Sequence, residues 1–261
     1  LITGAANGIG KACAERFAKE GAFVACLDVT DQSNEAAAQE CRDMGTEAIA
    51  LHCDVTNKDE IQQIVDTVMK KWGRIDVLVG SAGIYTGAPL TEVALKTWQR
   101  TIDINLTGVF LTCQAVVPIM MAQKSGSIIN ISSMAGFIGV YGYTAYGASK
   151  FAVSGFSDAL RSELKIYGIK VSVVFPPDTQ TPQLEYESKI KPFVTKEIGG
   201  SANLMTADAV ASEVLQKVAC GQYVILPGPE AKMLYVAQNL LGRSMYSVMD
   251  MLVRSAIGKI K

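Results

Sequence analysis

Histidine is nearly absent from this chain of 261 residues, in which His52 is the one example. A metal centre built from several histidines is therefore excluded, and we predict no metal site. The six cysteines include no CxxC pair and follow no regular spacing. That usage is typical of free thiols in a reducing compartment, so we expect a cytoplasmic protein in which most cysteines fill the core.

Net charge is also small. A formal charge of −1 at pH 7 provides no general attraction to nucleic acid, and we expect no nucleic acid partner. No leader of charged and then apolar residues opens the sequence, and we expect no helix able to span a membrane. With 49% hydrophobic residues, the chain can bury the core of one large domain, which argues against disorder.

Helix and strand patterns alternate along the chain. Glycine follows each of the first three predicted helices, 9–20, 32–44 and 56–72, where helices commonly end in a left-handed residue. The predicted strands are nearly continuous apolar runs, which favours a parallel sheet with helices on both faces. These strands span residues 1–4, 22–28, 46–52, 75–79, 127–132, 169–175 and 222–226.

The second half of the chain contains longer predicted helices. One covers 92–124, where we expect Pro118 to kink or end part of it, and another covers 144–167. Residues 176–206 are rich in proline, and so long a loop in a compact domain is usually functional. We therefore expect one domain, 1–261, with three parts: 1–175 as the cofactor-binding and catalytic core, 176–206 as the substrate loop and 228–261 as a helical extension.

A glycine-rich turn, Thr3 to Gly10, lies between the first predicted strand and helix. Glycines let the backbone approach a pyrophosphate, whose charge sits at the helix N-terminus. The next strand ends at Asp28, whose carboxylate can accept hydrogen bonds from both ribose hydroxyls and would repel a 2′-phosphate. Asp54, after the third strand, is placed for the adenine edge. Together these residues predict a dinucleotide site that prefers NAD(H) to NADP(H), although singly each is also compatible with a tight turn or a polar strand end.

Tyr146 and Lys150 stand four positions apart in a predicted helix, so their side chains share one face. A phenol with its ordinary pKa of ~10 is a poor acid–base catalyst at neutral pH. A nearby cation, helped by oxidised nicotinamide, favours the phenolate and lowers that pKa. Tyr141 and Tyr143 have no lysine at this offset. Taken alone, this motif is very common by chance and is usually an exposed pair that has no chemistry.

Two further polar residues belong to this pattern. Ser133 follows the strand 127–132, and open α/β sheets bind ligands at the carboxyl ends of their strands. Its hydroxyl can hold a substrate oxygen against Tyr146. Asn105 lies inside a helical pattern, where asparagine can bend the helix or bind a water. Without the other residues, Ser133 would be an ordinary turn serine and Asn105 an ordinary polar helix residue.

In order and spacing these residues resemble the short-chain dehydrogenase/reductase family across essentially the whole chain. The resemblance implies a Rossmann-type, doubly wound parallel sheet of about seven strands with helices on both faces. It also implies an NAD(P)-dependent oxidoreductase that transfers a hydride between nicotinamide and a ketone or secondary alcohol. Asn105, Ser133, Tyr146 and Lys150 would then form a catalytic tetrad. In it, Asn105 would hold a water in a proton relay through Lys150, and Tyr146 would be the acid in reduction and the base in oxidation.

The same resemblance implies a cofactor site along one edge of the sheet, and a homodimer or homotetramer formed through the two long central helices. One departure from the family pattern is Gly80-Ser81, where the family usually has two asparagines, and it puts a side-chain hydrogen bond that braces the sheet in doubt. The expected cofactor contacts are Gly4, Asn7, Gly8, Ile9, Gly10, Asp28, Asp54, Val55, Ser81, Ala82, Gly83, Tyr146, Lys150, Thr179 and Thr181.

A second departure is the segment Pro176-Pro177-Asp178, where the family usually has Pro-Gly. This segment resembles the 3-ketosphinganine reductase branch, which implies a long-chain 3-keto lipid as substrate. A steroid-like alcohol and a small polyol stay open as substrates. A non-catalytic nucleotide sensor on the same fold is the alternative to an enzyme, although an intact tetrad favours the enzyme. The branch typically uses NADPH, whereas Asp28 favours NAD(H).

The tail from residue 230 onward is rich in methionine, leucine and valine, and its basic residues outnumber its acidic ones. One interpretation is a helix packed on the domain or on a sister subunit. The other is an amphipathic element that lines a lipid site or touches a membrane surface, which would make the protein peripherally membrane-associated. The tail's charged residues are Glu230, Lys232, Arg243, Asp250, Arg254, Lys259 and Lys261.

Overall fold

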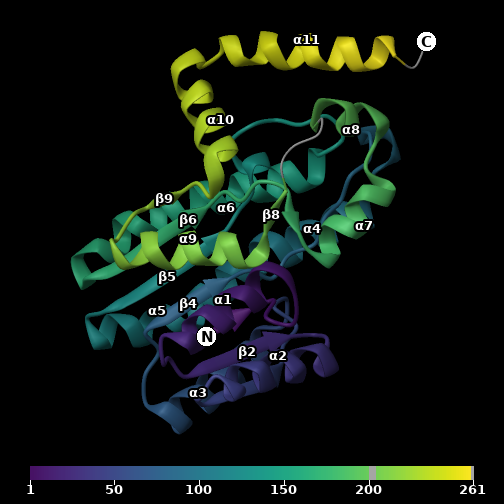
Figure 1. The fold of residues 1–261 in the computed structure, drawn as a ribbon. Helices are drawn as coiled ribbons and strands as arrows, with labels where there is room; N and C mark the ends of the chain where they lie inside the picture. The colour runs from purple at the N-terminus through teal and green to yellow at the C-terminus, as the bar shows by residue number, and fades with distance from the viewer. Residues whose placement is uncertain (200–203, 260–261) are drawn as a thin grey trace.

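Seven parallel strands form the central sheet in a computed structural model that describes residues 1–199 and 204–259 (Figure 1). The strand order, β3-β2-β1-β4-β5-β6-β9, reverses direction between β1 and β4. Open α/β sheets bind ligands in the crevice at such a reversal. The predicted doubly wound sheet is confirmed. Its strands are β1 (Ile2–Thr3), β2 (Val24–Asp28), β3 (Ala48–His52), β4 (Val77–Gly80), β5 (Gly126–Ile131), β6 (Ile169–Val174) and β9 (Val224–Ile225).

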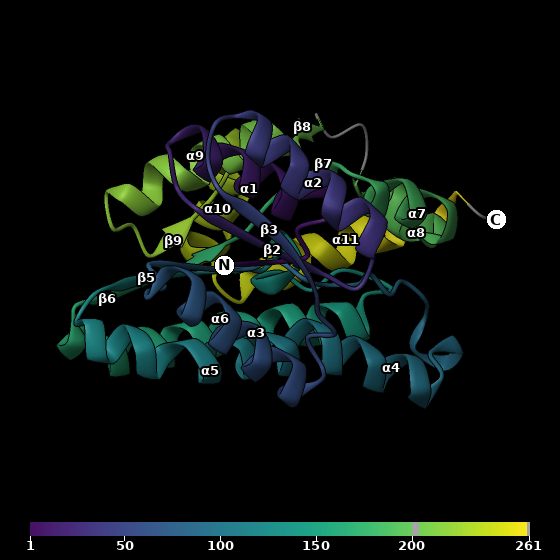
Figure 2. The same ribbon diagram turned by 90° about the horizontal axis from the view of Figure 1, so that it is seen from below.

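Helices cover both faces of the sheet, so the fold has three layers (Figure 2). One layer is formed by α1 (Gly8–Lys19), α2 (Asp31–Asp43) and α9 (Ala207–Ala219). The opposite layer is formed by α3 (Lys58–Trp72), α5 (Gly108–Gln123) and α6 (Thr144–Leu164). Short 3-10 turns are η1 (Leu90–Glu92), η3 (Met134–Gly136) and η4 (Lys165–Tyr167).

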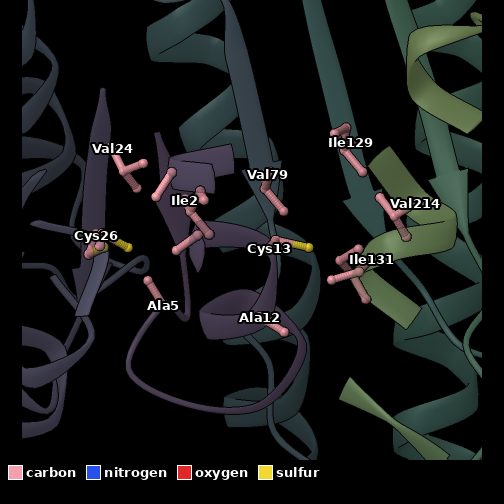
Figure 3. Close-up of a cluster of buried hydrophobic side chains, with 14 of the residues drawn as sticks. Ile2, Ala5, Ala12, Cys13, Val24, Cys26, Val79, Ile129, Ile131 and Val214 are labelled. Atoms are coloured by element: carbon pink, nitrogen blue, oxygen red, sulfur yellow. The ribbon is translucent and has the colours of Figure 1, made fainter. Parts of the chain in front are cut away.

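The core on the α1 side of the sheet combines branched strand residues with small helix residues (Figure 3). Ile2, Val79 and Ile129 project from neighbouring strands toward Ala12 and Cys13 of α1. Small side chains on α1 let the helix approach the sheet closely, which positions its N-terminus at the crevice. All six cysteines are free and five are buried, which confirms the prediction that most of them fill the core.

The ends of α3 show how local sequence sets the helix boundaries. Gly73 ends α3 in the left-handed conformation, at φ 74°, as predicted. Its N-cap is Asn57, whose side chain accepts hydrogen bonds from the backbone N–H groups of Asp59 and Glu60. The predicted start at Thr56 is therefore two residues too early, because α3 begins at Lys58 in the structure.

One long helical stretch runs through the centre of the α5 layer. It consists of α4 (Leu95–Ile102), a π-helical turn η2 (Asp103–Thr107) and α5, and it passes Pro118 without ending there. Asn105 lies in the π turn, which agrees with the expected local bend.

The stretch Leu95–Gln123 is long and apolar enough to cross a membrane by length and composition, so the expectation that no segment would be is wrong. This property alone is weak support for a membrane span, because core helices share it. Val109, Cys113, Val116 and Met120 on this stretch are buried against the sheet. In this fold one face of the segment packs against the sheet.

The segment 176–206 is not the continuous loop that we expected. It contains β7 (Thr179–Gln180), α7 (Pro182–Ile190), α8 (Phe193–Gly199) and β8 (Met205–Thr206), while residues 200–203 lie outside the described part. Its prolines were misleading because Pro182 occupies the first turn of α7, a position that tolerates a missing N–H. The hydroxyl of Thr181 caps this helix by accepting a hydrogen bond from Leu184 N at 3.2 Å.

The tail forms two helices, α10 (Gly228–Leu241) and α11 (Ser244–Gly258), and residues 260–261 lie outside the described part. In Figure 1, α10 rises away from the sheet and α11 crosses toward α8. Contacts between α11 and α8 agree with this view. Tyr235 anchors α10, because its ring packs at 5.2 Å from that of Phe137 and at 6.1 Å from that of Phe175.

Candidate active site

A cavity of about 440 Å³ opens at the carboxyl ends of the strands, at the point where the strand order reverses. Every predicted site residue except Gly10 and Asn105 lines it. Asp28 and Asp54 lie along it together with the glycine-rich turn, and so do Ser133, Tyr146 and Lys150. Among the described residues, no group of three or more potential ligands is arranged to hold a metal ion.

The glycine-rich turn leaves room for a phosphate group because its backbone is packed too tightly for side chains. Gly4 has φ 67°, and a Cβ there would lie 2.8 Å from the backbone nitrogen of Ala82. A Cβ on Gly10 would lie only 2.1 Å from the carbonyl oxygen of Gly4. Gly10 therefore does not line the cavity but allows α1 to start directly behind the turn. The α1 N-terminus at Gly8 faces the cavity, where its free N–H groups fit a pyrophosphate.

Asp28 is held at the end of β2 by two backbone donors. Its Oδ2 accepts a hydrogen bond from Ala6 N at 3.2 Å, and its Oδ1 accepts one from Thr30 N at 3.0 Å. These bonds leave acceptor capacity on both oxygens for hydroxyl donors. Asp54 is held by Thr56, whose backbone nitrogen and hydroxyl both donate to Asp54 Oδ1. The carboxylate acceptors of Asp28 and Asp54 fit the adenosine of a dinucleotide, and the glycine-rich turn fits its pyrophosphate.

At the departure Gly80-Ser81, the side chain of Thr3 holds the loop after β4. Its Oγ1 accepts hydrogen bonds from the backbone nitrogens of Ser81 at 3.1 Å and Ala82 at 3.2 Å. These bonds tie the loop after β4 to β1, at the strands between which the order reverses. The loop is thus braced without the asparagine side chain that the family pattern supplies.

Ser133, Tyr146 and Lys150 lie together at the inner end of the cavity. The side chain of Ser133 lies near the Tyr146 phenol and lowers its pKa, and the Nζ of Lys150 lies 5.7 Å from the centroid of the Tyr146 ring. The Lys150 Nζ donates to the carbonyl oxygen of Ile131 at 3.0 Å, which fixes the ammonium behind the phenol. Burial lowers the pKa of Lys150 to about 8.

Burial is the main influence on the phenol of Tyr146, and it raises the pKa. The charge of Glu187 raises this pKa further, while the Ser133 hydrogen bond lowers it. The sequence had suggested the opposite direction, on the expectation that Lys150 would favour the phenolate. In the structure the loss of hydration is the largest influence, so the neutral phenol is favoured.

Asn105 is fully buried and does not line the cavity. Its Oδ1 accepts from Ile84 N at 2.8 Å, and its Nδ2 donates to Ile84 O at 2.9 Å and to Ser149 Oγ at 3.0 Å. Both amide hydrogens are therefore engaged, so a relay water near Asn105 would bond to the remaining acceptor capacity of Oδ1 or to the backbone. The side chain instead ties the loop after β4 to α6. A Cβ on Gly83 would lie 3.3 Å from Asn105 Oδ1 and 3.4 Å from Lys150 Nζ, so the tetrad's inner residues flank this glycine.

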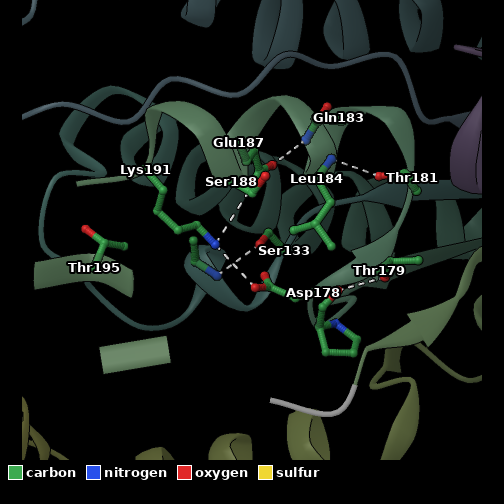
Figure 4. Close-up of polar contacts among 12 residues, drawn as sticks. Ser133, Asp178, Thr179, Thr181, Gln183, Leu184, Glu187, Ser188, Lys191 and Thr195 are labelled. Atoms are coloured by element: carbon green, nitrogen blue, oxygen red, sulfur yellow. Dashed lines mark hydrogen bonds and ion pairs between the residues drawn. The ribbon is translucent and has the colours of Figure 1, made fainter. Parts of the chain in front are cut away.

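Sequence reasoning missed the charged residues that α7 and the segment before β7 contribute to the site. Glu187 and Asp178 line the cavity, and Lys191 lies 3.2 Å from Asp178 Oδ2 (Figure 4). A signal was present, because Gln183, Glu187 and Lys191 follow one another at four-residue spacing, which places them on one helix face. Because we predicted a loop in this segment, the spacing did not indicate that these side chains share a helix face.

Comparisons with known proteins agree with this geometry. The family model described as short chain dehydrogenase matches residues 1–191. The 3-oxoacyl-[acyl-carrier-protein] reductase FabG of Thermotoga maritima is 41% identical over 185 residues, which cover 71% of this chain and 75% of the relative. The 3-dehydrosphinganine reductase of Danio rerio is 32% identical over 239 residues, which cover 90% of this chain and 72% of the relative. The solved structure of a levodione reductase superposes with a TM-score of 0.81 at 27% identity, covering 89% of this chain and 96% of that one.

Proposed function

We propose, since the chain belongs to the short-chain dehydrogenase family of carbonyl and alcohol oxidoreductases, that its substrate is a long-chain 3-keto lipid such as 3-ketosphinganine. The observation that carries this proposal is the extent of the likeness. The match to the Danio rerio 3-dehydrosphinganine reductase covers 90% of the chain, whereas the matches to two 3-oxoacyl-[acyl-carrier-protein] reductases cover 71% and 82%. The names of these relatives describe a carbonyl at carbon 3 of a lipid-type substrate.

The proposed chemistry assigns the proton steps to three side chains. A bound nicotinamide supplies the hydride in reduction and accepts it in oxidation. Tyr146 donates the proton to the substrate's carbonyl oxygen. The Ser133 hydroxyl holds that oxygen against the phenol, and the Lys150 ammonium stabilises the phenolate that remains. Asn105 positions this group by fixing the loop after β4 against α6.

NAD(H) is the proposed cofactor. Asp28 ends β2 on the cavity wall with acceptor capacity left on both carboxylate oxygens, which suits two ribose hydroxyls. The same charge opposes a 2′-phosphate, and the segment that follows, Val29 to Gln32, contains no arginine or lysine to receive one. The 3-ketosphinganine reductase branch typically uses NADPH. Because of Asp28, we expect this chain to differ from that branch in its cofactor preference.

The tail is the proposed contact with lipid. Along α10 and α11, Leu240 is 82% exposed, Met233 69% and Met251 63%, so these helices leave much of their apolar surface in solvent. Basic residues outnumber acidic ones on the same segment, which favours the anionic surface of a membrane. None of the described residues of α10 and α11 lines the cavity. Their influence on the substrate would pass through α8, against which α11 packs.

A homodimer or homotetramer is proposed through the central helices. Phe110 of α5 is 42% exposed and Phe151 of α6 is 45% exposed, although both helices otherwise pack in the core. Aromatic side chains on the outer face of a core helix are typical of subunit interfaces.

The test is a panel of ketones and alcohols of graded chain length, assayed with NADH, NADPH and their oxidised forms by nicotinamide absorbance. The panel contains 3-ketosphinganine, a 3-oxoacyl thioester of matched chain length, a steroid ketone and a small polyol. We expect the highest kcat/KM with 3-ketosphinganine. A preference for the thioester would favour the second candidate, 3-oxoacyl reduction, which the 41% identity to the Thermotoga maritima enzyme supports. Activity on the polyol alone would contradict the lipid proposal.

A further inference from the structure

The wall of the cavity nearest the catalytic residues carries more negative charge than positive charge. Asp178 and Glu187 both line this wall, and the cation between them is Lys191, which is not among the residues that line the cavity. Lys191 Nζ lies 3.2 Å from Asp178 Oδ2 and 3.8 Å from Glu187 Oε2. The single ammonium of Lys191 therefore lies near both carboxylates, on the side away from the cavity. Figure 4 shows these side chains converging near Ser133.

Glu187 is the more deeply placed of the two carboxylates. Its residue is 7% exposed, and its Oε1 accepts one hydrogen bond, from Gln183 Nε2 at 3.0 Å. A buried carboxylate is costly unless it is fully paired, and the 3.8 Å approach of Lys191 is too long for a hydrogen bond. Burial accordingly raises the pKa of Glu187. The side chain thus retains capacity for a further cationic donor from the cavity side.

Neither of the other cations that line the cavity is hydrogen-bonded to these two carboxylates. Arg100 is exposed at the rim, and Lys150 is engaged with the carbonyl oxygen of Ile131. The charge of Glu187 reaches the reacting group, because it raises the pKa of both Tyr146 and Lys150. Asp178 also acts on Tyr146 in the same direction. The negative wall is therefore close to the position that a substrate carbonyl would take.

We infer that Glu187 and Asp178 bind an ammonium group carried on the carbon next to the substrate's carbonyl, and that they select 2-amino ketones over neutral ketones of the same length. This inference rests on the proposed function and identifies the substrate's ammonium as the group that the site recognises. An ammonium has three donors and meets two carboxylates whose third partner, Lys191, lies behind them. A ketone without the amine leaves the buried carboxylate unpaired, which is the stronger source of discrimination.

A purely structural ion pair that holds α7 in place is the competing explanation. In that case the loss of Glu187 would change stability, or change activity equally with all ketones. The two explanations differ in the ratio of activities on two substrates, which a general structural defect does not alter.

The experiment compares a soluble 2-amino-3-ketone with its N-acetyl derivative, which has the same carbonyl and chain but no charge. The kcat/KM of the full chain is measured with each ketone and NADH, for wild type, Glu187→Gln and Glu185→Gln. Glu185 is a matched control, because it is exposed on the same helix and does not line the cavity. We expect the amine to be preferred by wild type, and the ratio to fall about 10- to 100-fold in Glu187→Gln, the range for a lost charge-assisted hydrogen bond. The ratio should not change in Glu185→Gln.

A ratio that is the same in all three proteins, or an unselective wild type, would overturn the inference while leaving ketone reduction itself intact. If wild type reduces neither ketone, the proposed function fails, and the inference is then decided by binding. Calorimetric titration with a long-chain 2-amino-1,3-diol and its N-acetyl form reports the same discrimination without turnover. Tighter binding of the free amine that is lost in Glu187→Gln supports the inference, and equal binding overturns it. Asp178→Asn provides a second variant if Glu187→Gln does not fold.

Discussion

The buried phenol of Tyr146 on α6 lies within the field of the Glu187 carboxylate on α7. Burial first, and this charge second, raise the pKa of the phenol. Glu187, which lies 41 residues after Tyr146 in the sequence, therefore influences the ionisation of the Tyr146 hydroxyl. The phenol is therefore held in its neutral form, which is the form that donates a proton in reduction, whereas oxidation requires the phenolate.

This arrangement predicts the pH dependence of reduction. Lys150 has its pKa lowered to about 8, so its ammonium is lost as the pH rises through about 8, while the phenol stays protonated to higher pH. We expect kcat/KM with NADH to fall above about pH 8. Because Glu187 raises the pKa of Lys150, Glu187→Gln should move this fall to lower pH.

The measurement is kcat/KM against pH for a neutral ketone, so that no substrate amine titrates. Glu185→Gln is the control, since it removes the same charge from the exposed side of α7. An unchanged profile in Glu187→Gln would show that its carboxylate does not act on the catalytic groups.

Tyr146→Phe is expected to lower kcat by at least ~10²–10⁴-fold, the usual loss when general acid–base catalysis is removed. The ring stays packed edge-on against Tyr85 and Tyr143, at 5.5 Å and 5.7 Å, so the fold and NADH binding should persist. Stopped-flow turnover and NADH titration measure the two effects separately. Tyr186→Phe, an exposed position on α7, is the control, and near-normal turnover in Tyr146→Phe would refute its assigned role.

Asp28→Ala is expected to narrow the preference for NADH over NADPH by about 10- to 100-fold, because it removes two charge-assisted bonds to ribose and relieves repulsion of a 2′-phosphate. The ratio of kcat/KM for the two cofactors is the measurement. Asp43→Ala is the matched control, because it removes an exposed carboxylate at the far end of α2. Higher kcat/KM with NADPH in the wild-type protein would contradict this interpretation of β2.

Gly10→Ala is expected to destabilise the protein by about 1–3 kcal/mol and to weaken NADH binding, because the added Cβ would meet the Gly4 carbonyl oxygen at 2.1 Å and displace the turn. Thermal unfolding and NADH titration measure the two effects. Gly155→Ala in α6 is the control, since its Cβ would meet nothing within 4 Å and should stabilise the helix by up to about 1 kcal/mol. Equal thermal stability and equal NADH affinity of the two variants would mean that the glycine-rich turn accommodates the added Cβ.

The residues that sequence reasoning located share one property, which is that their roles follow from neighbours in the chain. The glycine-rich turn, Asp28 at a strand end and Tyr146 one helical turn before Lys150 are local patterns. Glu187 could not be found in this way, because its effect depends on α7 folding over the cavity. The pKa of Tyr146 was misjudged for the same reason, since burial is set by the assembled fold and spacing shows only which groups share a helix face.

The exposed apolar surface of α10 and α11 predicts a dependence on substrate chain length. Each methylene that this apolar surface covers contributes ~0.8 kcal/mol, so kcat/KM should rise by up to roughly fourfold per methylene until the surface is fully covered.

Changing Leu240 and Met251 to serine tests this without removing packed residues, since both side chains are largely exposed. The double variant should flatten the chain-length series while leaving NADH binding intact, because the cofactor cavity contains no described residue of the tail. A truncation after Gly242 removes α11 entirely and should flatten the series further. If the tail is instead a contact between subunits, both variants will change the sedimentation coefficient and leave the slope of the series unchanged. Measuring both quantities on the same samples separates a lipid-facing tail from an oligomer contact, and a flat series in wild type would exclude the lipid role at once.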